Sequence, residues 1–269
     1  MTIKRRRKGS KQIHRIKWKN SDDLLYALDP AIWVKEVLGI KPDPWQAQLL
    51  RSRSKRIILN CSRQSGKSTI CAALGLHESI YRRPSFGMAI APSQDQSGEL
   101  MMKFDEFRQA AELTSEYLDT DTKLAVKFAN GNRFIARPGS AKTSRGKSAV
   151  TLLLEDEAAW VDDLLKKSVS PMLAVSGGRY IMMSTPFGKR GHFHETWMNA
   201  KNWEKYEINA DQCPRISPEF LQQELDDGMP RQFWLQEYYN QFTDTDNQLF
   251  AFELVNSAFS AEVKVLAIA

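Results

Sequence analysis

The chain has 269 residues, of which 42% are hydrophobic and 26% are charged. These values predict a globular protein, and they are enough for one large α/β core, or a core with a small appendage. No apolar run approaches the roughly 18 residues that a membrane helix needs, so we expect no membrane partner. The three cysteines are too few and too scattered for a disulfide framework or a zinc site, and we expect them to be packing residues.

The formal net charge of +6 is unevenly distributed. Residues 1–20 contain nine Lys and Arg residues and no acidic residue, so the rest of the chain has a net charge of six minus nine, or −3. We interpret residues 1–20 as a basic tail. The tail either contacts phosphate groups, with release of their counterions, or is a disordered, solvated arm that docks a partner.

Apolar periodicity predicts strands and helices that alternate along the chain. The first helical pattern covers residues 21–38, with Ser21 as its N-cap, and the second covers 45–52. Further helices are expected at 70–81 and 94–111, and strands at 56–60, 86–91, 149–154, 179–183 and 205–208.

Two further strands, at 124–128 and 133–136, flank the pair Asn130-Gly131, which is typical of a tight hairpin turn. The alternation of strands and helices predicts an α/β fold with a mainly parallel, doubly wound sheet. We expect residues 21–210 to form this core. Because helical patterns dominate after residue 217, we expect residues 211–260 to form a small helical lid subdomain.

A phosphate-binding loop is predicted in the sequence CSRQSGKST at 61–69, between a strand and a helix. Its end matches the Walker A pattern, although Cys61 stands where that pattern has its first glycine. Backbone N–H groups and the positive end of the following helix favour phosphate binding there. The alternative is a polar turn ahead of a helix. The predicted nucleotide-binding residues are Gln46, Ser62, Arg63, Gln64, Ser65, Gly66, Lys67, Ser68 and Thr69.

Within this loop, Lys67 is expected to hold the β- and γ-phosphates of ATP, and Ser68 to ligate Mg²⁺. Upstream of the loop, Gln46 is expected to recognise adenine, because its amide both donates and accepts. The alternative for Gln46 is an exposed helix residue. We expect its neighbour Trp45 to pack in the core.

Three acidic residues follow the apolar strand at 149–154. We assign Asp156 to Mg²⁺ and Glu157 to activation of the attacking water, because alternation along a strand turns neighbouring side chains apart. Glu155 competes with Glu157 by position, but Ala158 directly after Glu157 favours our assignment. The alternative is an acidic loop that ends the strand.

Two arginines are candidates for stabilising the transition state, an effect worth roughly a thousandfold or more in rate. Arg63 lies in the phosphate loop, where it would reach the γ-phosphate of its own subunit. Arg145 lies in the Gly- and Ser-rich segment 139–148, from which it would reach the nucleotide of a neighbouring subunit. The alternative for both is a surface arginine.

The hydroxyls of Ser184 and Thr185, at the end of the strand at 179–183, are predicted to couple the γ-phosphate state to a DNA-gripping element. The alternative is a capped strand end. His192 and His194 follow in the same region without further metal ligands nearby. We interpret them as surface or packing residues rather than as a metal site.

Taken together, these segments resemble the ATPase domain of large terminase subunits from tailed bacteriophages, over residues 29–260. The resemblance implies a P-loop NTPase of the ASCE type that uses ATP and Mg²⁺. It also supports Arg63 as a cis-acting arginine, Arg145 as a trans-acting finger, and Ser184 and Thr185 as the coupling motif. It rests on PWQAQLL at 44–50, CSRQSGKST at 61–69, NGNRFIA at 130–136, LLLEDEAA at 152–159 and MMSTPFG at 182–188.

In function, the resemblance implies a motor that hydrolyses ATP to move double-stranded viral DNA into a procapsid. The implied partners are double-stranded DNA, a portal protein, a small terminase subunit and further copies of the chain in a ring, a pentamer in this family. The implied place is the host cytoplasm, at the procapsid portal. We expect the chain to be a monomer when alone.

Members of this family also carry a C-terminal nuclease, and residues 261–269 are interpreted as the beginning of such a domain. Because no carboxylate cluster follows, we expect no DNA cleavage by this chain. Two other functions stay open on the sequence alone. One is a helicase-like DNA-remodelling ATPase, and the other is a docking module that binds nucleotide as a switch.

Overall fold

The computed structural model describes residues 22–113, 117–139 and 148–243. The predictions for the basic tail, for Arg145 and for the C-terminal residues 261–269 lie outside these ranges. Eight strands form one sheet in the order β3-β4-β5-β2-β6-β7-β1-β8. They are β1 (Arg56–Cys61), β2 (Phe86–Ala91), β3 (Leu118–Thr122), β4 (Ala125–Phe128), β5 (Arg133–Pro138), β6 (Leu152–Asp156), β7 (Arg179–Ser184) and β8 (Glu204–Ile208).

The neighbouring strands β5, β2, β6, β7, β1 and β8 are parallel. At one edge of the sheet, β4 pairs antiparallel with both β5 and β3. This confirms the mainly parallel sheet and the hairpin between β4 and β5, at whose turn Gly131 has a φ of +89°. Strand β7 lies between β1 and β6. The phosphate loop and the acidic residues therefore follow two strands that are not neighbours, and the end of β7 lies between them.

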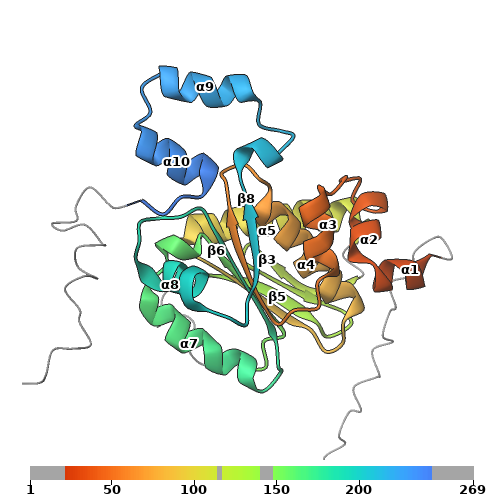
Figure 1. Cartoon of the computed structure of the whole chain (residues 1–269). Helices are drawn as coiled ribbons and strands as arrows, with labels where there is room; N and C mark the ends of the chain where they lie inside the picture. The colour runs from red at the N-terminus through yellow and green to blue at the C-terminus, as the bar shows by residue number, and fades with distance from the viewer. Residues whose placement is uncertain (1–21, 114–116, 140–147, 244–269) are drawn as a thin grey trace, which may run out of the picture.

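Helices cover both faces of the sheet (Figure 1). They are α1 (Asp23–Leu28), α2 (Pro30–Glu36), α3 (Pro44–Arg51), α4 (Lys67–Tyr81), α5 (Gln94–Ala110), α7 (Asp163–Ala174), α8 (Gly191–Asn199), α9 (Pro218–Asp226) and α10 (Arg231–Tyr239), with short 3-10 helices η2 (Ala158–Trp160) and η3 (Ala210–Gln212). None of the helices in the described ranges is both long and apolar enough to cross a membrane.

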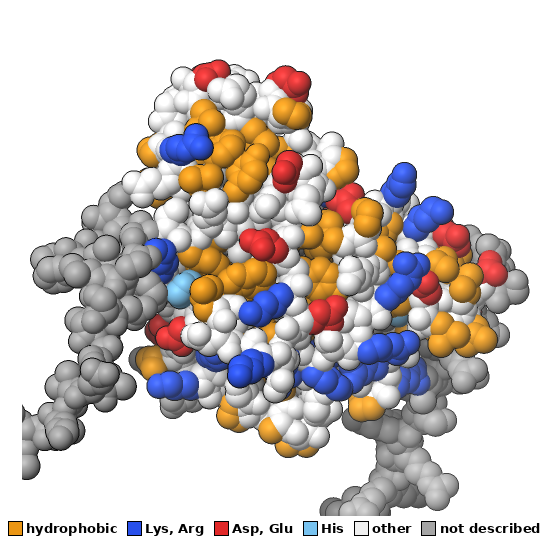
Figure 2. Space-filling view, in the orientation of Figure 1, with side chains coloured by type: hydrophobic (Ala, Val, Ile, Leu, Met, Phe, Trp, Pro, Cys, Tyr) orange, Lys and Arg blue, Asp and Glu red, His pale blue; other side chains and the backbone are white. Residues whose placement is uncertain are grey.

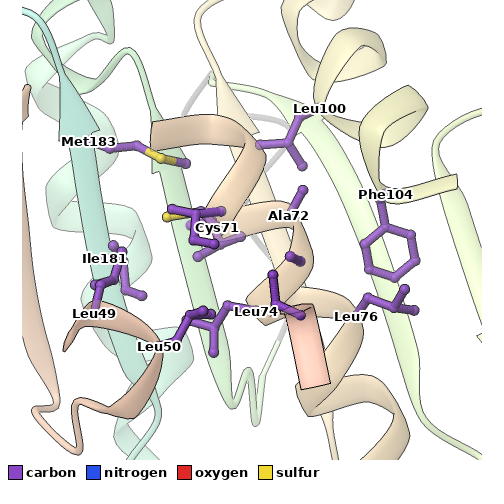
Figure 3. Packing of buried hydrophobic residues seen from close by; sticks show 14 of the residues in the cluster. Leu49, Leu50, Cys71, Ala72, Leu74, Leu76, Leu100, Phe104, Ile181 and Met183 are labelled. Carbon is purple, nitrogen blue, oxygen red and sulfur yellow. The ribbon is translucent and has the colours of Figure 1, made fainter. Parts of the chain in front are cut away.

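Alternation along the buried strands divides the core into two layers. One layer joins α3, α4 and α5 to the sheet, and Figure 3 shows Leu74 and Phe104 among its side chains. The other layer joins α7 and α8 to the opposite face. Within β6, Leu154 packs in the first layer and Leu153 in the second. By the same alternation, Asp156 faces α4 and Glu155 faces α7 and α8.

The single helix expected over residues 21–38 is wrong, because the chain forms two helices, α1 and α2, that are separated at Asp29. Proline at position 30 lacks an N–H group and fits the first turn of a helix, so it ends one helix and begins the next. The Asp29 side chain accepts hydrogen bonds from the N–H groups of Ala31 and Ile32 and thereby caps α2.

Two predictions about packing are confirmed. Trp45 is buried, and all three cysteines are buried and free. The interpretation of His192 and His194 is confirmed in part: both are buried, so the surface alternative is wrong. Their helix α8, like α7 and strand β3, was not predicted from the sequence.

After β8 the chain leaves the core and forms α9 and α10 above the edge of the sheet, at the top of Figure 1. Two hydrogen bonds join this part to the end of β1: the Arg63 N–H donates to the Glu237 carbonyl at 2.9 Å, and the Asn60 amide donates to the Asn240 carbonyl at 3.1 Å. Figure 2 shows apolar side chains gathered over α9 and α10, while many Lys and Arg side chains lie over the lower core.

Candidate active site

The predicted phosphate loop is a turn between β1 and α4 at the carboxyl edge of the parallel strands. Gln64 and Gly66 both have positive φ angles, of 58° and 87°. Gly66 is therefore favoured by conformation, and a Cβ atom there would also lie only 2.9 Å from the Gln46 amide nitrogen, which would have to shift. The first N–H groups of α4 have no partner within the helix, and the turn leaves them available to an anion.

Five side chains meet where β1, β6 and β7 end, and we call them the front cluster: Lys67, Ser68, Asp156, Glu157 and Ser184. The Ser68 hydroxyl donates to Asp156 Oδ1 at 3.0 Å. Lys67 Nζ lies 3.2 Å from Glu157 Oε1. The Ser184 hydroxyl donates to Glu157 Oε2 at 3.2 Å and accepts from the N–H of Ala159.

Asp156 is buried, and burial raises the pKa of its carboxyl group to about 6. This value is a net result: the negative charge of Glu157 adds to the effect of burial, whereas Lys67 and the hydrogen bond from Ser68 oppose the rise. A carboxyl group that is costly to ionise gains when a cation binds to it.

The donor atoms of Ser68 and Asp156 fit a magnesium ion. Both are hard oxygen donors, and their 3.0 Å separation is close to the roughly 2.9 Å between adjacent ligands of an octahedron with Mg–O distances of about 2.0–2.1 Å. Within the described ranges no three His, Cys, Asp or Glu side chains are grouped so as to hold a metal on their own. A metal here would therefore complete its shell with water and phosphate oxygens.

Glu157 reaches the site by a different route from the one we predicted. It lies just after β6 with φ 48° and ψ 46°, the left-handed conformation, so a turn of the backbone and not strand alternation separates it from Asp156. Its side chain is 26% exposed, which leaves room for a water molecule beside it. Glu155, the competing candidate, points to the opposite face of the sheet and is absent from the front cluster.

The other predicted residues of the loop lie around the front cluster. Ser62 and Ser65 are buried, and the Ser62 hydroxyl lies 3.8 Å from Cys213 Sγ. Thr69 is half-buried in the first turn of α4. Thr185 is buried directly after Ser184. These placements leave the backbone of the loop, more than its hydroxyls, open to a ligand.

Gln46 is buried, so the exposed-helix alternative is wrong. Its amide oxygen accepts from the Asp43 N–H at 3.0 Å, and its amide nitrogen donates to the Ser65 carbonyl at 3.3 Å. Gln46 thus braces the phosphate loop, and its recognition of adenine stays a prediction. The Arg63 side chain is 71% exposed and points to α10, where its Nε lies 3.0 Å from Glu237 Oε2.

Arg215 was missed by the sequence analysis. Its guanidinium group donates to both carboxylate oxygens of Asp43, at 3.2 and 2.7 Å, and to the Ser65 carbonyl at 2.8 Å. It therefore joins the segment after β8 to the phosphate loop. Its main partner, Asp43, lies 172 residues away in the chain, so no local sequence pattern could have indicated the contact.

Comparisons with known proteins agree with this geometry. Residues 58–257 match the family described as terminase large subunit, T4likevirus-type, N-terminal. The large terminase subunits of Thermus phage G20c and Thermus virus P23-45 are each 29% identical over 204 residues, which is 69% of this chain and 42% of theirs. The chain thus spans less than half the length of these relatives.

Among solved structures, the ATPase domain of the Thermus phage P74-26 large terminase superposes with a TM-score of 0.67 at 24% identity, covering 80% of this chain and 100% of that one. The HK97 bacteriophage large terminase superposes with a TM-score of 0.59 at 15% identity, covering 82% of this chain and 49% of that one. These likenesses show the fold of the large terminase ATPase domain. Since the family match covers well over half of the sequence, the chain belongs to the terminase large-subunit family, as an N-terminal domain of the T4-like virus type.

Proposed function

We propose that this domain hydrolyses ATP to ADP and phosphate and thereby drives double-stranded viral DNA into a procapsid. The observation that carries the proposal is the front cluster, in which the lysine and serine of the phosphate loop meet Asp156 and Glu157 across the end of β7. A solved large terminase from a thermophilic bacteriophage, similar in fold with a TM-score of 0.57, is in complex with ADP. That likeness supports a nucleotide as the ligand of this loop.

In the proposed reaction, the triphosphate binds to the N–H groups of the loop, and its oxygens compete with Glu157 for the Lys67 ammonium group. Glu157 is then free to accept a proton from the attacking water, while Ser184 keeps its carboxylate oriented. When bound, Mg²⁺ held by Ser68 and Asp156 would neutralise charge on the phosphate oxygens.

Ser184 and Thr185 are proposed to couple hydrolysis to movement. Ser184 contacts both Glu157 and the turn that follows it. A change of partner at Glu157 would therefore alter the hydrogen bonds at the end of β7. We propose that the following loop passes this change to an element that grips DNA. Its contacts would be mainly to phosphate groups, because a packaging motor must accept any sequence.

The remaining assignments belong to the same proposal. Arg63 would exchange Glu237 for the γ-phosphate of its own subunit, and Arg145 would act on a neighbouring subunit in a homo-oligomeric ring. Gln46 would recognise adenine. Residues 211–260 would act as the lid. The partners of the assembled motor would be a portal protein and a small terminase subunit, in the host cytoplasm.

The substitution Glu157→Gln tests this function. It keeps the size of the side chain but removes the proton acceptor, so ATP should still bind while the rate of phosphate release falls about 100- to 10,000-fold. The matched control is Glu207→Gln, which removes the same charge from an exposed position of β8. Binding is measured by equilibrium titration with a fluorescent ATP analogue, and release under single-turnover conditions with DNA and partner proteins present.

Normal turnover by Glu157→Gln would defeat the assignment of this residue. Tight ATP binding by the unmodified chain without any hydrolysis, in the presence of DNA and the partner proteins, would favour the docking module instead. Strand separation by the isolated chain would favour the helicase-like alternative.

A further inference from the structure

The face of β6 opposite the front cluster holds a second group of polar side chains, which we call the back cluster: Glu155, Asp163, Tyr180 and His192. Glu155 precedes Asp156 in the strand and is only 1% exposed. Strands of this kind are apolar at such positions, because a buried carboxylate is costly unless it is paired. Glu155 therefore needs specific partners, and the reaction proposed above gives it none.

Both carboxylate oxygens of Glu155 have a partner in the back cluster. The Tyr180 hydroxyl donates to Oε2, and His192 Nε2 lies 2.9 Å from Oε1. On the other side of the ring, His192 Nδ1 lies 3.1 Å from Asp163 Oδ1, which also accepts from the backbone N–H of His192 at 2.7 Å. His192 is thus held between two carboxylates from two different elements, β6 and α7.

This geometry favours a charged ring. Because an ionised carboxylate can only accept hydrogen bonds, a His192 ring that donates to both Glu155 and Asp163 carries a proton on each nitrogen. Burial disfavours the charged ring, but the hydrogen bonds and charges of Glu155 and Asp163 outweigh burial and raise the pKa of His192. The positive ring supplies the counter-charge that the buried Glu155 requires.

The position of His192 along the chain connects the two clusters. It is the second residue of α8, and α8 begins where the loop after Ser184 and Thr185 ends. At the start of that loop, Ser184 contacts Glu157, and at its end His192 contacts Glu155. The loop is therefore attached at both ends to the two residues that flank Asp156.

We propose that His192 is a positioning residue for ATP hydrolysis. Its ion pair with Glu155 and its contacts with Asp163 hold the start of α8 against the end of β6. The loop between Ser184 and α8 therefore keeps one geometry relative to Asp156 and Glu157. This role rests on the function proposed above. It acts on the rate of the chemical step rather than on nucleotide binding, because His192 lies on the face of the sheet away from the phosphate loop.

A role in packing alone makes a different prediction. Without its partner, Glu155 would be an uncompensated buried charge and would either take up a proton or move toward water, which disturbs the strand. An apolar pair at both positions would remove that problem and fill the same space. It would not supply the directional hydrogen bonds that fix α8 against β6, so the two roles separate when both residues are changed together.

The experiment therefore compares His192→Gln, the double variant Glu155→Leu/His192→Leu and the milder Asp163→Ala, all in the whole chain under conditions in which the unmodified chain hydrolyses ATP. Asp163 is 65% exposed, so its removal leaves the core intact. The control is His194→Gln, which changes a buried histidine of the same helix whose ring packs on Phe242. The measurements are kcat, KM for ATP and the melting temperature.

We expect His192→Gln to lower kcat at least tenfold with KM for ATP within about twofold of the unmodified value, and Asp163→Ala to lower kcat several-fold at an unchanged melting temperature. The double variant should regain the melting temperature of the unmodified chain but not its kcat. Recovery of kcat in the double variant, or an unchanged kcat in Asp163→Ala, would overturn the positioning role alone. An unmodified chain that never hydrolyses ATP would overturn the proposed function and this role with it.

Discussion

The two faces of β6 carry neighbouring carboxylates that the structure treats in opposite ways. On the front face, the partners of Asp156 and Glu157 are a lysine and two hydroxyl groups at the mouth of the phosphate loop. On the back face, Glu155 is enclosed by the Tyr180 hydroxyl and the His192 ring, which a ligand cannot displace without opening the core. Under the proposed function, the carboxylates assigned to chemistry have exchangeable partners, whereas the carboxylate assigned to positioning has permanent ones.

The largest effect is expected from removing Lys67, the cation that ATP would share with Glu157. We expect Lys67→Ala to weaken ATP binding about 10- to 150-fold, because a hydrogen bond to a charged group contributes about 1.5–3 kcal/mol. Since Glu157 reaches solvent, the melting temperature should change little. Lys167→Ala, which removes a charge from an exposed position of α7, is the control. Equal binding by both variants in a fluorescence titration would break the comparison.

A smaller effect is expected at the edge of the front cluster, where Arg215 joins the segment after β8 to the phosphate loop. Because its side chain is half-exposed, its contacts with Asp43 are worth at most about 1 kcal/mol. Arg215→Ala should therefore weaken ATP binding only about two- to fivefold. The exposed Arg231 at the start of α10 provides the control, Arg231→Ala. A loss as large as that of Lys67→Ala would show that Arg215 contacts the nucleotide itself.

The smallest expected effect distinguishes the two faces by pH, in melting curves recorded without magnesium. The pKa of Asp156 is raised from 3.8 to about 6 in the folded chain, so folding favours its protonated form, and this contribution is lost as pH rises from about 4 to 6. The pKa of His192 is raised above 6.5, so the contribution of its charged ring is complete below pH 6.5 and is lost as pH rises beyond that value.

The difference between the melting curves of the unmodified chain and Asp156→Asn isolates the first pH window, and the difference from His192→Gln isolates the second. Each difference should change by a few degrees across its own window and stay constant outside it. Two curves that coincide in both windows would mean that the two faces titrate as one unit, against the comparison.

The fold followed from the sequence where residues are buried on both faces of the sheet. Strand β2 is apolar throughout, and β1 and β7 have apolar central runs between polar ends, which is what a covered parallel strand requires. The prediction failed where a proline obscured the helical pattern. Helix α7 contains Pro171, which a helix interior disfavours, and α1 and α2 were merged because the break at Asp29 and Pro30 went unrecognised.

In the candidate site, the loop and the acidic pair were predictable because each lies in one short stretch of sequence. Arg215 and His192 were not, since each acquires its role from residues far away in the chain: Asp43 for the first, Glu155 and Asp163 for the second. The one available signal was the acidic residue at position 155, directly after the apolar run Leu152 to Leu154 of a buried strand. It was interpreted as a rival to Glu157 and not as a group in need of a buried partner.

The burial of all three cysteines has a practical consequence. Thiol-reactive dyes attack the thiolate, and burial raises the pKa of Cys61 to about 12, with the pKa values of Cys71 and Cys213 raised for the same reason. A cysteine introduced on the exposed surface of α9 or α10 would therefore be labelled selectively in the otherwise unmodified chain. Single-molecule energy transfer between such a dye and a fluorescent nucleotide would then follow the distance between helix and loop in real time.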